Sequence, residues 1–266
     1  MNRFLLVAVI FLASCMAPRS SSVTPCPDVN IPVNGKLFTS VFMQDAAEYR
    51  ALCYQAYNLA RLRVDEYLQT NHGNRPPAIV TDIDETILDN SPFTVHQGLI
   101  GKEYDPQSWN AWTSLAAADS IPGACSFLKY AKSKGFAIYY ITNRDEKDRN
   151  PTLINLKKFG FPDCDSSHLF TREKTSSKEE RRLHVAETHD IVLLLGDNLA
   201  DFSNLFDKKT QEERKANTDD QSVIFGSRFI VLPNATYGDW EPALYRYQKY
   251  TPAQKDSLIR SVLKAY

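Results

Sequence analysis

The chain has 266 residues, of which 43% are hydrophobic and 24% are charged, a balance that is ordinary for a globular protein. Its 31 Lys and Arg residues are matched by 32 Asp and Glu residues. The net charge of −1 argues against a basic nucleic-acid-binding surface, so we expect no nucleic-acid partner. Beyond the N-terminal stretch, no apolar run reaches the length of a transmembrane helix.

The N-terminal stretch has the features of a bacterial export signal. Arg3 supplies a positive charge, and residues 4–12 form an apolar run that is too short to span a bilayer. Small residues then lead into Cys15, an order that resembles the lipobox of bacterial lipoproteins; an ordinary secretory signal is the alternative. We therefore predict a signal peptide over residues 1–14 and a lipidated Cys15, with residues 15–34 as a flexible tether.

This interpretation predicts an exported protein that is attached to the outer membrane by its lipid anchor only, on the periplasmic or the cell-surface side. Export permits disulfides, but the sequence gives no pairing for the remaining cysteines. No Cys-x-x-Cys motif or Cys/His cluster occurs, so we predict no zinc site. The remaining cysteines are Cys26, Cys53, Cys125 and Cys164.

The rest of the chain, residues 35–266, is long enough for one domain with a sizeable core. Phe38–Thr70 contains neither Gly nor Pro, and its apolar residues recur every three or four positions, which predicts one or two amphipathic helices. Gly and Pro residues interrupt the chain at Asn71–Pro77. Apolar strands and helices then alternate. We predict strands at 78–80, 136–141, 191–195 and 228–232, and helices at 122–134, 150–159, 176–188 and 251–266.

Continuous apolar strands joined by helices are typical of a mostly parallel sheet. The predicted fold class is therefore α/β, with a Rossmann-like parallel sheet and flanking helices. The remaining chain allows a small, mainly helical cap or flanking subdomain. Ligands of such sheets bind at the carboxyl ends of the strands.

Polar side chains follow three of the predicted strands at these ends. Because neighbouring parallel strands end at the same edge of a sheet, we expect these side chains to converge on one crevice. They are Asp82 and Asp84 after the first strand, Thr142, Asn143 and Arg144 after the second, and Asp197 and Asp201 after the third.

These residue types suit phosphoryl chemistry. Crowded carboxylates repel one another and require a cation, and Mg²⁺ commonly bridges carboxylates to a substrate phosphate. Asp82, Asp197 and a backbone carbonyl near Asp84 can form such a site. An aspartate carboxylate can attack phosphorus, and a second carboxyl group can protonate the leaving alcohol and later activate water. The Thr142 hydroxyl can donate to a phosphate oxygen.

A phosphoryl group also requires a positive charge, for which Lys178 at a predicted helix start is our first choice and Lys174 our second. Each feature also has an ordinary explanation. A lone Asp-x-Asp can cap a loop, Thr-Asn is common in turns, and a Lys/Glu/Arg run is usually a solvated helix face. The coincidence of signals at several strand ends favours a common site.

In combination, the motifs resemble those of the haloacid-dehalogenase superfamily phosphatases, and specifically the class C bacterial acid phosphatases of the outer-membrane lipoprotein 5′-nucleotidase branch. The resemblance covers about residues 79–241 of this sequence. It is carried by residues 82–90 (DIDETILDN), 141–144 (ITNR), Lys178 and 196–202 (GDNLADF), and extends to 109–112, 121–124 and 232–241.

The resemblance implies a haloacid-dehalogenase-like phosphatase domain over residues 35–266, with helical N-terminal and cap segments. It implies that Asp82 is the nucleophile and a Mg²⁺ ligand. Asp84 would be the general acid and base and would also give its carbonyl oxygen to the metal. Asp197 would be a metal ligand, and Asp201 would support the metal site.

The same resemblance implies that Thr142 and Lys178 hold the phosphoryl group and act with the catalytic aspartates. We also expect Asn143 and Arg144 to contact the substrate. The expected partner is a small phosphomonoester, and the sequence leaves a homodimer open.

The resemblance further suggests nucleoside 5′-monophosphates, including nicotinamide mononucleotide, as substrates. Trp109 and Tyr237 could sandwich a base, with each ring contributing on the order of 1–3 kcal/mol by stacking. Packing in the core is the ordinary alternative for both rings.

Two other classes of function compete with a phosphatase. Glycosyltransferases also use Asp-x-Asp, but they do not need a Lys and a second acidic strand end around a transferable phosphoryl group. A non-enzymatic, surface-anchored binding lipoprotein on the same scaffold is the main alternative, although binding alone would not require both Asp82 and Asp84.

Overall fold

The structure is a computed structural model that describes residues 30–70 and 73–266. The predicted signal peptide, Cys15, Cys26 and most of the predicted tether lie outside these residues. In the described part, no helix is both long and apolar enough to cross a membrane. No disulfide joins Cys53, Cys125 or Cys164.

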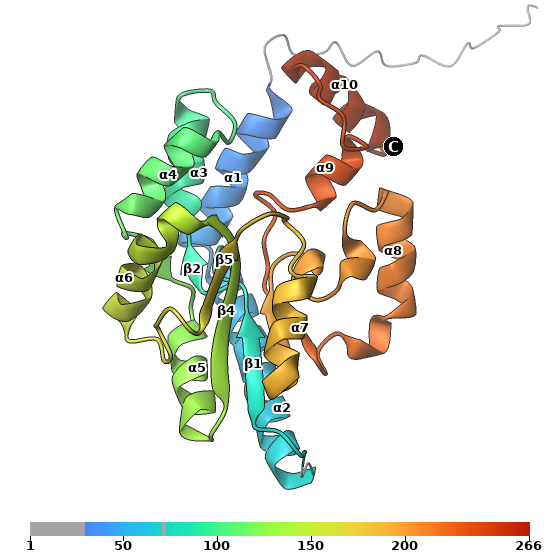
Figure 1. Cartoon of the computed structure of the whole chain (residues 1–266). Coiled ribbons are helices and arrows are strands. Elements are labelled where there is room, and N and C mark those ends of the chain that lie inside the picture. The colour runs from blue at the N-terminus through green and yellow to red at the C-terminus, as the bar shows by residue number, and fades with distance from the viewer. Residues whose placement is uncertain (1–29, 71–72) are drawn as a thin grey trace, which may run out of the picture.

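A five-stranded sheet forms the centre of the molecule (Figure 1). Its strand order is β5-β4-β1-β6-β7, and every neighbouring pair is parallel, which confirms the predicted α/β class. The four predicted strands are present as β1, β4, β6 and β7, and β5 is an edge strand that the sequence pattern did not indicate. The bounds are β1 Pro77–Thr81, β4 Ala137–Asp145, β5 Leu169–Arg172, β6 Asp190–Gly196 and β7 Phe229–Val231.

Helices cover both faces of the sheet because the strands are apolar on both sides. In β1, Ile79 packs into one buried cluster and Val80 into another. The first cluster also holds apolar residues of three helices, which are α2 (Ala47–Thr70), α5 (Ala124–Ser133) and α6 (Arg149–Phe159). The second holds Val185 of α7 (Glu179–Thr188).

The predicted helical pattern at the N-terminus is confirmed, with a different starting point. Helix α1 (Ile31–Asp45) begins four residues before the expected start of the domain. The Asn30 side chain accepts a hydrogen bond from the Val33 N–H at 3.3 Å, and Pro32 lies in the first turn, where its missing N–H costs nothing. In α2 the buried residues recur every three or four positions; they are Tyr49, Cys53, Tyr57, Ala60 and Val64.

Several predicted boundaries differ from the structure by a few residues; helix α7, for example, begins at Glu179 rather than at 176, and the last helix ends at Val262 rather than at 266. Strand β4 continues to Asp145. Thr142, Asn143 and Arg144, which we expected just beyond the strand, therefore lie within it. Helix α6 follows directly on a 3-10 turn at Glu146–Asp148 and begins at Arg149, one residue before the predicted start at 150. A proline is tolerated in this first helical turn because its missing N–H has no intrahelical partner. Gly160 ends α6 in the left-handed conformation (φ 69°).

Helices gather above the carboxyl ends of the strands and form the expected mainly helical cap (Figure 1). A two-stranded antiparallel ribbon leads into this region. Helix α1 packs against α3 of the cap, where Leu37 lies against Gly98. The bounds are α3 Ser91–Leu99, α4 Pro106–Ser114, α8 Gln211–Asp220, α9 Trp240–Leu244, α10 Pro252–Val262, β2 Leu88–Asp89 and β3 Asp119–Ser120, with further 3-10 turns at Leu199–Asp201, Asn204–Phe206 and Ser222–Ile224.

Candidate active site

The three strand ends that carry the predicted polar residues lie side by side. Strand β1 pairs with β4 on one side and with β6 on the other. Just beyond β1, the Asp82 N–H donates to the Leu195 carbonyl oxygen of β6 at 2.9 Å, which fixes the turn that carries Asp82. The expected convergence on one crevice therefore follows from the strand order.

Lys178 reaches this crevice. Its ammonium group contacts Oδ1 of Asp82 and lies 2.7 Å from Oδ1 of Asp201. All three side chains are buried, with at most 9% exposed. Lys174, the second choice from the sequence, is exposed on the preceding loop. Lys178 immediately precedes α7, so the start of that helix positions its backbone.

Burial and the lysine act in opposite directions on the carboxyl group of Asp82. Burial raises the pKa of Asp82 to about 7, although the Lys178 charge lowers it. For Lys178, burial alone would lower the pKa, but the carboxylates of Asp201 and Asp82 outweigh it and raise the pKa above its ordinary value. The lysine is therefore held in its charged form beside the predicted nucleophile.

Asp197 is oriented by two residues to which the sequence analysis assigned no role. Its carboxylate accepts hydrogen bonds from the Thr86 hydroxyl at 3.1 Å and from the Asn234 amide at 2.7 Å. Burial raises the pKa of Asp197 well above its ordinary range, and the nearby charges of Asp201 and Asp82 add to this effect. An additional positive charge would offset this crowding of carboxylates.

Asp201 can lie close to the end of β6 because residue 196 is a glycine. Its Oδ2 accepts the Asn198 N–H at 3.0 Å. A Cβ atom at Gly196 would lie 2.5 Å from Cβ and Oδ2 of Asp201. Glycine is therefore required at position 196 for Asp201 to approach.

The carboxylates of Asp82, Asp197 and Asp201 fit a hard divalent cation. Each offers an oxygen atom within 4.8 Å of the others, and only oxygen ligands are present in this group. Lys178 supplies one positive charge against three carboxylates, so the donor set has room for further positive charge. The side chain of Asp84 is not part of this group.

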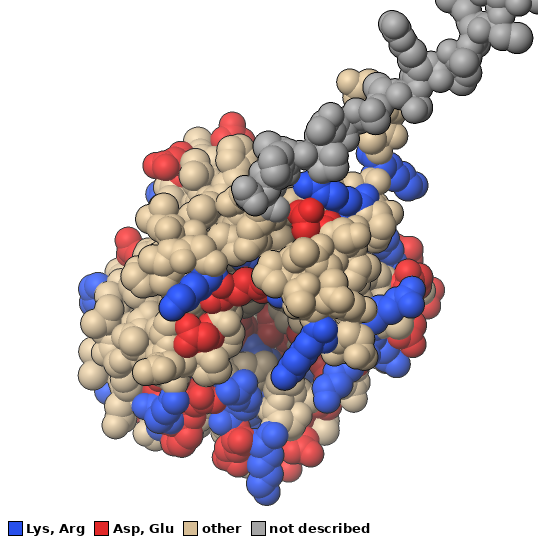
Figure 2. All heavy atoms as spheres, turned by 90° about the horizontal axis from the view of Figure 1, so that it is seen from above, with Lys and Arg blue, Asp and Glu red and all other residues tan. Residues whose placement is uncertain are grey.

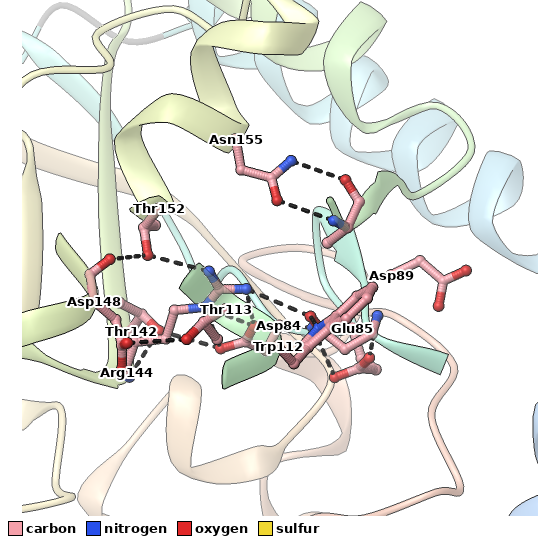
Figure 3. A network of polar contacts seen from close by, with 12 residues as sticks. Asp84, Glu85, Asp89, Trp112, Thr113, Thr142, Arg144, Asp148, Thr152 and Asn155 are labelled. Carbon is pink, nitrogen blue, oxygen red and sulfur yellow. Dashed lines mark hydrogen bonds and ion pairs between the residues drawn. The ribbon is translucent and has the colours of Figure 1, made fainter. Parts of the chain in front are cut away.

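The Asp84 carboxylate lies toward β4 and is bound by Arg144 (Figure 3). Nη2 of Arg144 donates to Oδ1 of Asp84 at 2.7 Å, and the Asn90 amide donates to the same oxygen at 2.9 Å. The Arg144 side chain is 1% exposed. Arg144, which we expected to contact the substrate, therefore has its guanidinium committed to Asp84.

Thr142 and Asn143, the other two predicted site residues of β4, lie in different places from Arg144. The Thr142 hydroxyl lies 3.4 Å from Oδ2 of Asp84 and accepts the Arg144 N–H at 3.1 Å. Asn143 is exposed, and its amide donates to the Ser176 carbonyl at 2.9 Å, which links β4 to the loop before Lys178. Thr142 thus lies at the crevice, and Asn143 organises the loop that carries the lysine.

A cleft of about 950 Å³ opens beside Asp84 toward the cap. Figure 2 shows this face hollowed, with acidic and basic side chains around the hollow. Trp109 and Tyr237 both line the cleft, as the base-clamp prediction requires. The Trp109 ring also packs edge-to-face on Phe93, with 5.0 Å between ring centroids, so its packing role and its exposure to the cleft coexist.

Sequence reasoning missed Glu85 as a residue of this site. Its backbone is left-handed (φ 56°), and its buried side chain accepts hydrogen bonds from the Asn90 N–H and the Tyr237 hydroxyl. Burial raises the pKa of Glu85 to about 8, and the Asp84 charge adds to this. Glu85 belongs to the quoted first motif, but nothing local indicated its link to Tyr237.

A family model described as HAD superfamily, subfamily IIIB (Acid phosphatase) matches residues 15–240. The chain therefore belongs to subfamily IIIB of the haloacid-dehalogenase superfamily, the acid phosphatases. Two solved structures of the class C acid phosphatase from Bacillus anthracis, one with tungstate bound, match with TM-scores of 0.85 and identities of 41% and 42%. These matches cover 90% of this chain and 100% of theirs.

Two curated plant proteins are more distant relatives. The chain is 27% identical to acid phosphatase 1 of Solanum lycopersicum over 128 residues, which is 46% of this chain and 50% of the relative. It is also 27% identical to the stem 31 kDa glycoprotein of Glycine max over 125 residues, covering 45% and 49% respectively. The chain spans about half the length of these curated relatives.

Proposed function

We propose that this protein is a Mg²⁺-dependent acid phosphatase that hydrolyses nucleoside 5′-monophosphates through an aspartyl-phosphate intermediate on Asp82. The observation that carries the proposal is the buried contact of Lys178 with Asp82 and Asp201. It stands beside a separate, hydrogen-bonded Asp84 at the mouth of the cleft. A nucleophile and a second, separately held carboxyl group are what two-step phosphoryl transfer requires.

In the first step, the Asp82 carboxylate attacks phosphorus and the phosphorus–oxygen ester bond breaks. Asp84 gives its proton to the departing alcohol oxygen, while Lys178 and Thr142 hold the phosphoryl oxygens. In the second step, a water molecule loses a proton to Asp84 and attacks phosphorus, which releases phosphate and restores the Asp82 carboxylate.

Asp82 and Asp197 are the side chains that would hold Mg²⁺, with the backbone carbonyl of Asp84 and with Asp201 in support. When bound, the metal would neutralise charge on the phosphoryl group. The oxygen-only donor set and its excess negative charge support this proposal.

A nucleotide is the proposed substrate because the cleft beside Asp84 is lined by aromatic rings. Trp109 and Tyr237 lie in its walls, and the Tyr237 hydroxyl is tied to Glu85, which holds the ring in place. Stacking between two rings tolerates different bases, so we expect broad specificity among nucleoside 5′-monophosphates, including nicotinamide mononucleotide.

We also propose export and attachment to the outer membrane through a lipid on Cys15. The order of Arg3, an apolar run, small residues and Cys15 supports this, although these residues lie outside the described part of the chain. A homodimer is a further proposal that sedimentation of the purified protein can test.

The deciding experiment is phosphate release from AMP and from nicotinamide mononucleotide by the full chain in Mg²⁺, beside Asp82→Asn. We expect release by the wild type and a loss of at least about 10³-fold in the variant, because the nucleophile is removed. Equal activity of the two proteins would overturn the role of Asp82. Tight nucleotide binding without turnover by the wild type would favour a binding lipoprotein instead.

A further inference from the structure

The two oxygens of the Asp84 carboxylate have unequal surroundings. Oδ1 accepts three hydrogen bonds, at 2.7 and 3.0 Å from Arg144 and at 2.9 Å from Asn90. Oδ2 has only two longer contacts, at 3.3 Å from Nε of Arg144 and at 3.4 Å from the Thr142 hydroxyl. A carboxylate oxygen has about two lone-pair sites, so the donors already occupy Oδ1.

The two donor residues are themselves held by the elements around them. Nη1 of Arg144 donates to the Thr152 hydroxyl of α6 at 3.1 Å. The Asn90 amide oxygen accepts the Trp112 indole N–H of α4 at 2.8 Å. Figure 3 shows this network running from Asp84 back into the body of the protein. The orientation of Asp84 is therefore fixed by buried contacts.

We propose that Arg144 and Asn90 are positioning residues that turn Asp84 so that Oδ2 is the atom that exchanges protons with the substrate. The inference rests on the proposed function. In the first step the proton passes from Oδ2 to the alcohol oxygen as its bond to phosphorus breaks. In the second step a proton from the attacking water returns to Oδ2.

The test compares two substrates, one whose leaving group must be protonated as it departs and one whose leaving group need not be. The ribose alkoxide of AMP must be protonated as it departs, whereas p-nitrophenolate is stable without a proton. Loss of correct positioning of Asp84 should therefore lower kcat/KM for AMP far more than for p-nitrophenyl phosphate. The ratio kcat/KM reports the steps up to release of the alcohol, so the later hydrolysis of the aspartyl-phosphate does not enter.

Arg144→Lys is the first variant because it keeps the charge and loses the planar fork that binds Asp84. We expect kcat/KM for AMP to fall about 10²-fold, the scale of a small misplacement of a catalytic group. For p-nitrophenyl phosphate we expect a fall of less than about threefold, because proton donation contributes little there. Asp84→Asn should show the same preference, and adding Arg144→Lys to it should cause no further loss for AMP.

Thr152→Val provides a milder variant, since it removes the hydroxyl group behind Arg144 and keeps the side-chain shape. It should shift the ratio of the two kcat/KM values in the same direction by a smaller factor. The control is Arg149→Lys on α6, because Arg149 binds Glu146 and Leu169 but does not contact Asp84. This control should leave the ratio at the wild-type value.

The outcomes distinguish the positioning role of Arg144 and Asn90 from the proposed phosphatase function. Arg144→Lys and Thr152→Val could lower kcat/KM for both substrates by one common factor while Asp84→Asn lowers it selectively for AMP. That result would overturn the positioning role and leave the proposed phosphatase function intact. If the wild type hydrolyses neither substrate, the proposed function itself fails. A selective loss for AMP in both variants, with the control unchanged, supports Oδ2 as the proton-transferring atom.

Discussion

At the scale of single residues, the buried lysine is the most consequential feature of the site. Two carboxylates and an ammonium group have been taken out of water within one small volume, since Lys178 contacts both Asp82 and Asp201. Such a cluster is stable only while its charges are balanced, because removing one partner leaves an uncompensated buried charge. The lysine therefore balances the buried carboxylates, and we propose that it also takes part in catalysis.

The substitution Lys178→Met should lower both the stability and the activity of the protein. We expect the free energy of unfolding to fall by about 3–5 kcal/mol, because two buried carboxylates lose their counter-charge. We expect kcat for p-nitrophenyl phosphate to fall at least about 10²-fold, the usual cost of removing one group that stabilises developing charge. Urea unfolding and steady-state kinetics measure the two effects.

Lys174→Met is the matched control, because Lys174 lies on the same loop and is exposed. It should behave as the wild type in both measurements. The assignment would be reversed if Lys174→Met lost activity and Lys178→Met kept it.

At the scale of elements, the edge strand β5 depends on contacts from outside the sheet. The side chain of Glu146, in the 3-10 turn before α6, binds Arg149 through two hydrogen bonds at 2.6 and 2.8 Å and also accepts the Thr171 hydroxyl of β5. Arg149 in turn donates to the Leu169 carbonyl of β5 at 2.6 Å. This small network ties the edge strand to the start of α6.

The stability that Glu146 contributes should depend on pH. Hydrogen bonds from Arg149 and Thr171 lower the pKa of Glu146 below its ordinary value of 4.5. A lowered pKa means that the contribution is fully present above about 4.5 and is lost as pH falls through the folded-state pKa. Glu146→Gln should therefore lower the Tm relative to the wild type at neutral pH, with the difference shrinking as the solution becomes acidic.

Thermal unfolding of both proteins at several pH values tests this dependence. Glu180→Gln is a suitable control, because Glu180 is an exposed residue of α7. It should leave the Tm close to that of the wild type at every pH. A Tm difference for Glu146→Gln that stayed constant down to strongly acidic pH would contradict the assigned ionic contact.

At the scale of the whole molecule, the C-terminal segment closes one side of the cleft. Residues 241–255 lie beyond the part that matches the family model, and several of them line the cleft. Two ion pairs hold the segment: Lys36 of α1 binds Glu241 at 2.9 Å, and Lys255 of α10 binds Glu103. The cleft therefore has walls from both ends of the described chain.

Lys255→Met should loosen this wall. We expect KM for AMP to rise by about threefold to tenfold, which corresponds to the loss of about 1 kcal/mol of binding. For glycerol phosphate, which has no ring to contact the wall, we expect little change. Lys264→Met, at an exposed position beyond α10, is the control. Equal changes in KM for both substrates would show that the segment does not select for the ring.

Removal of the metal tests whether the carboxylates of Asp82, Asp197 and Asp201 need a divalent cation for activity. EDTA should abolish phosphate release, and added Mg²⁺ should restore it, because the carboxylates repel a phosphate that no cation accompanies. Mg²⁺ should also raise the Tm, since a ligand that binds only the folded state stabilises it. Full activity after exhaustive chelation would refute the metal requirement.

Much of the fold could be predicted from the sequence, because apolar runs and helical periodicity are local properties of the chain. The strands β1, β4, β6 and β7 were found this way. The edge strand β5 was missed because its four residues alternate between buried and half-buried positions and contain Arg172. The 3-10 turn at Glu146–Asp148 was not predicted, because Asp148 is held there by hydrogen bonds from Asn110 and Thr113 of α4, which are distant in the chain.

The sequence by itself determined the α/β class and the residues that gather at the ends of the central strands, because motif spacing and strand position are set within short stretches. Only the tertiary structure placed Lys178 rather than Lys174 beside Asp82, paired Arg144 with Asp84, and brought Glu85 to Tyr237. These pairings join residues that are distant in the chain, so they depend on how the strands and the cap pack rather than on any local pattern.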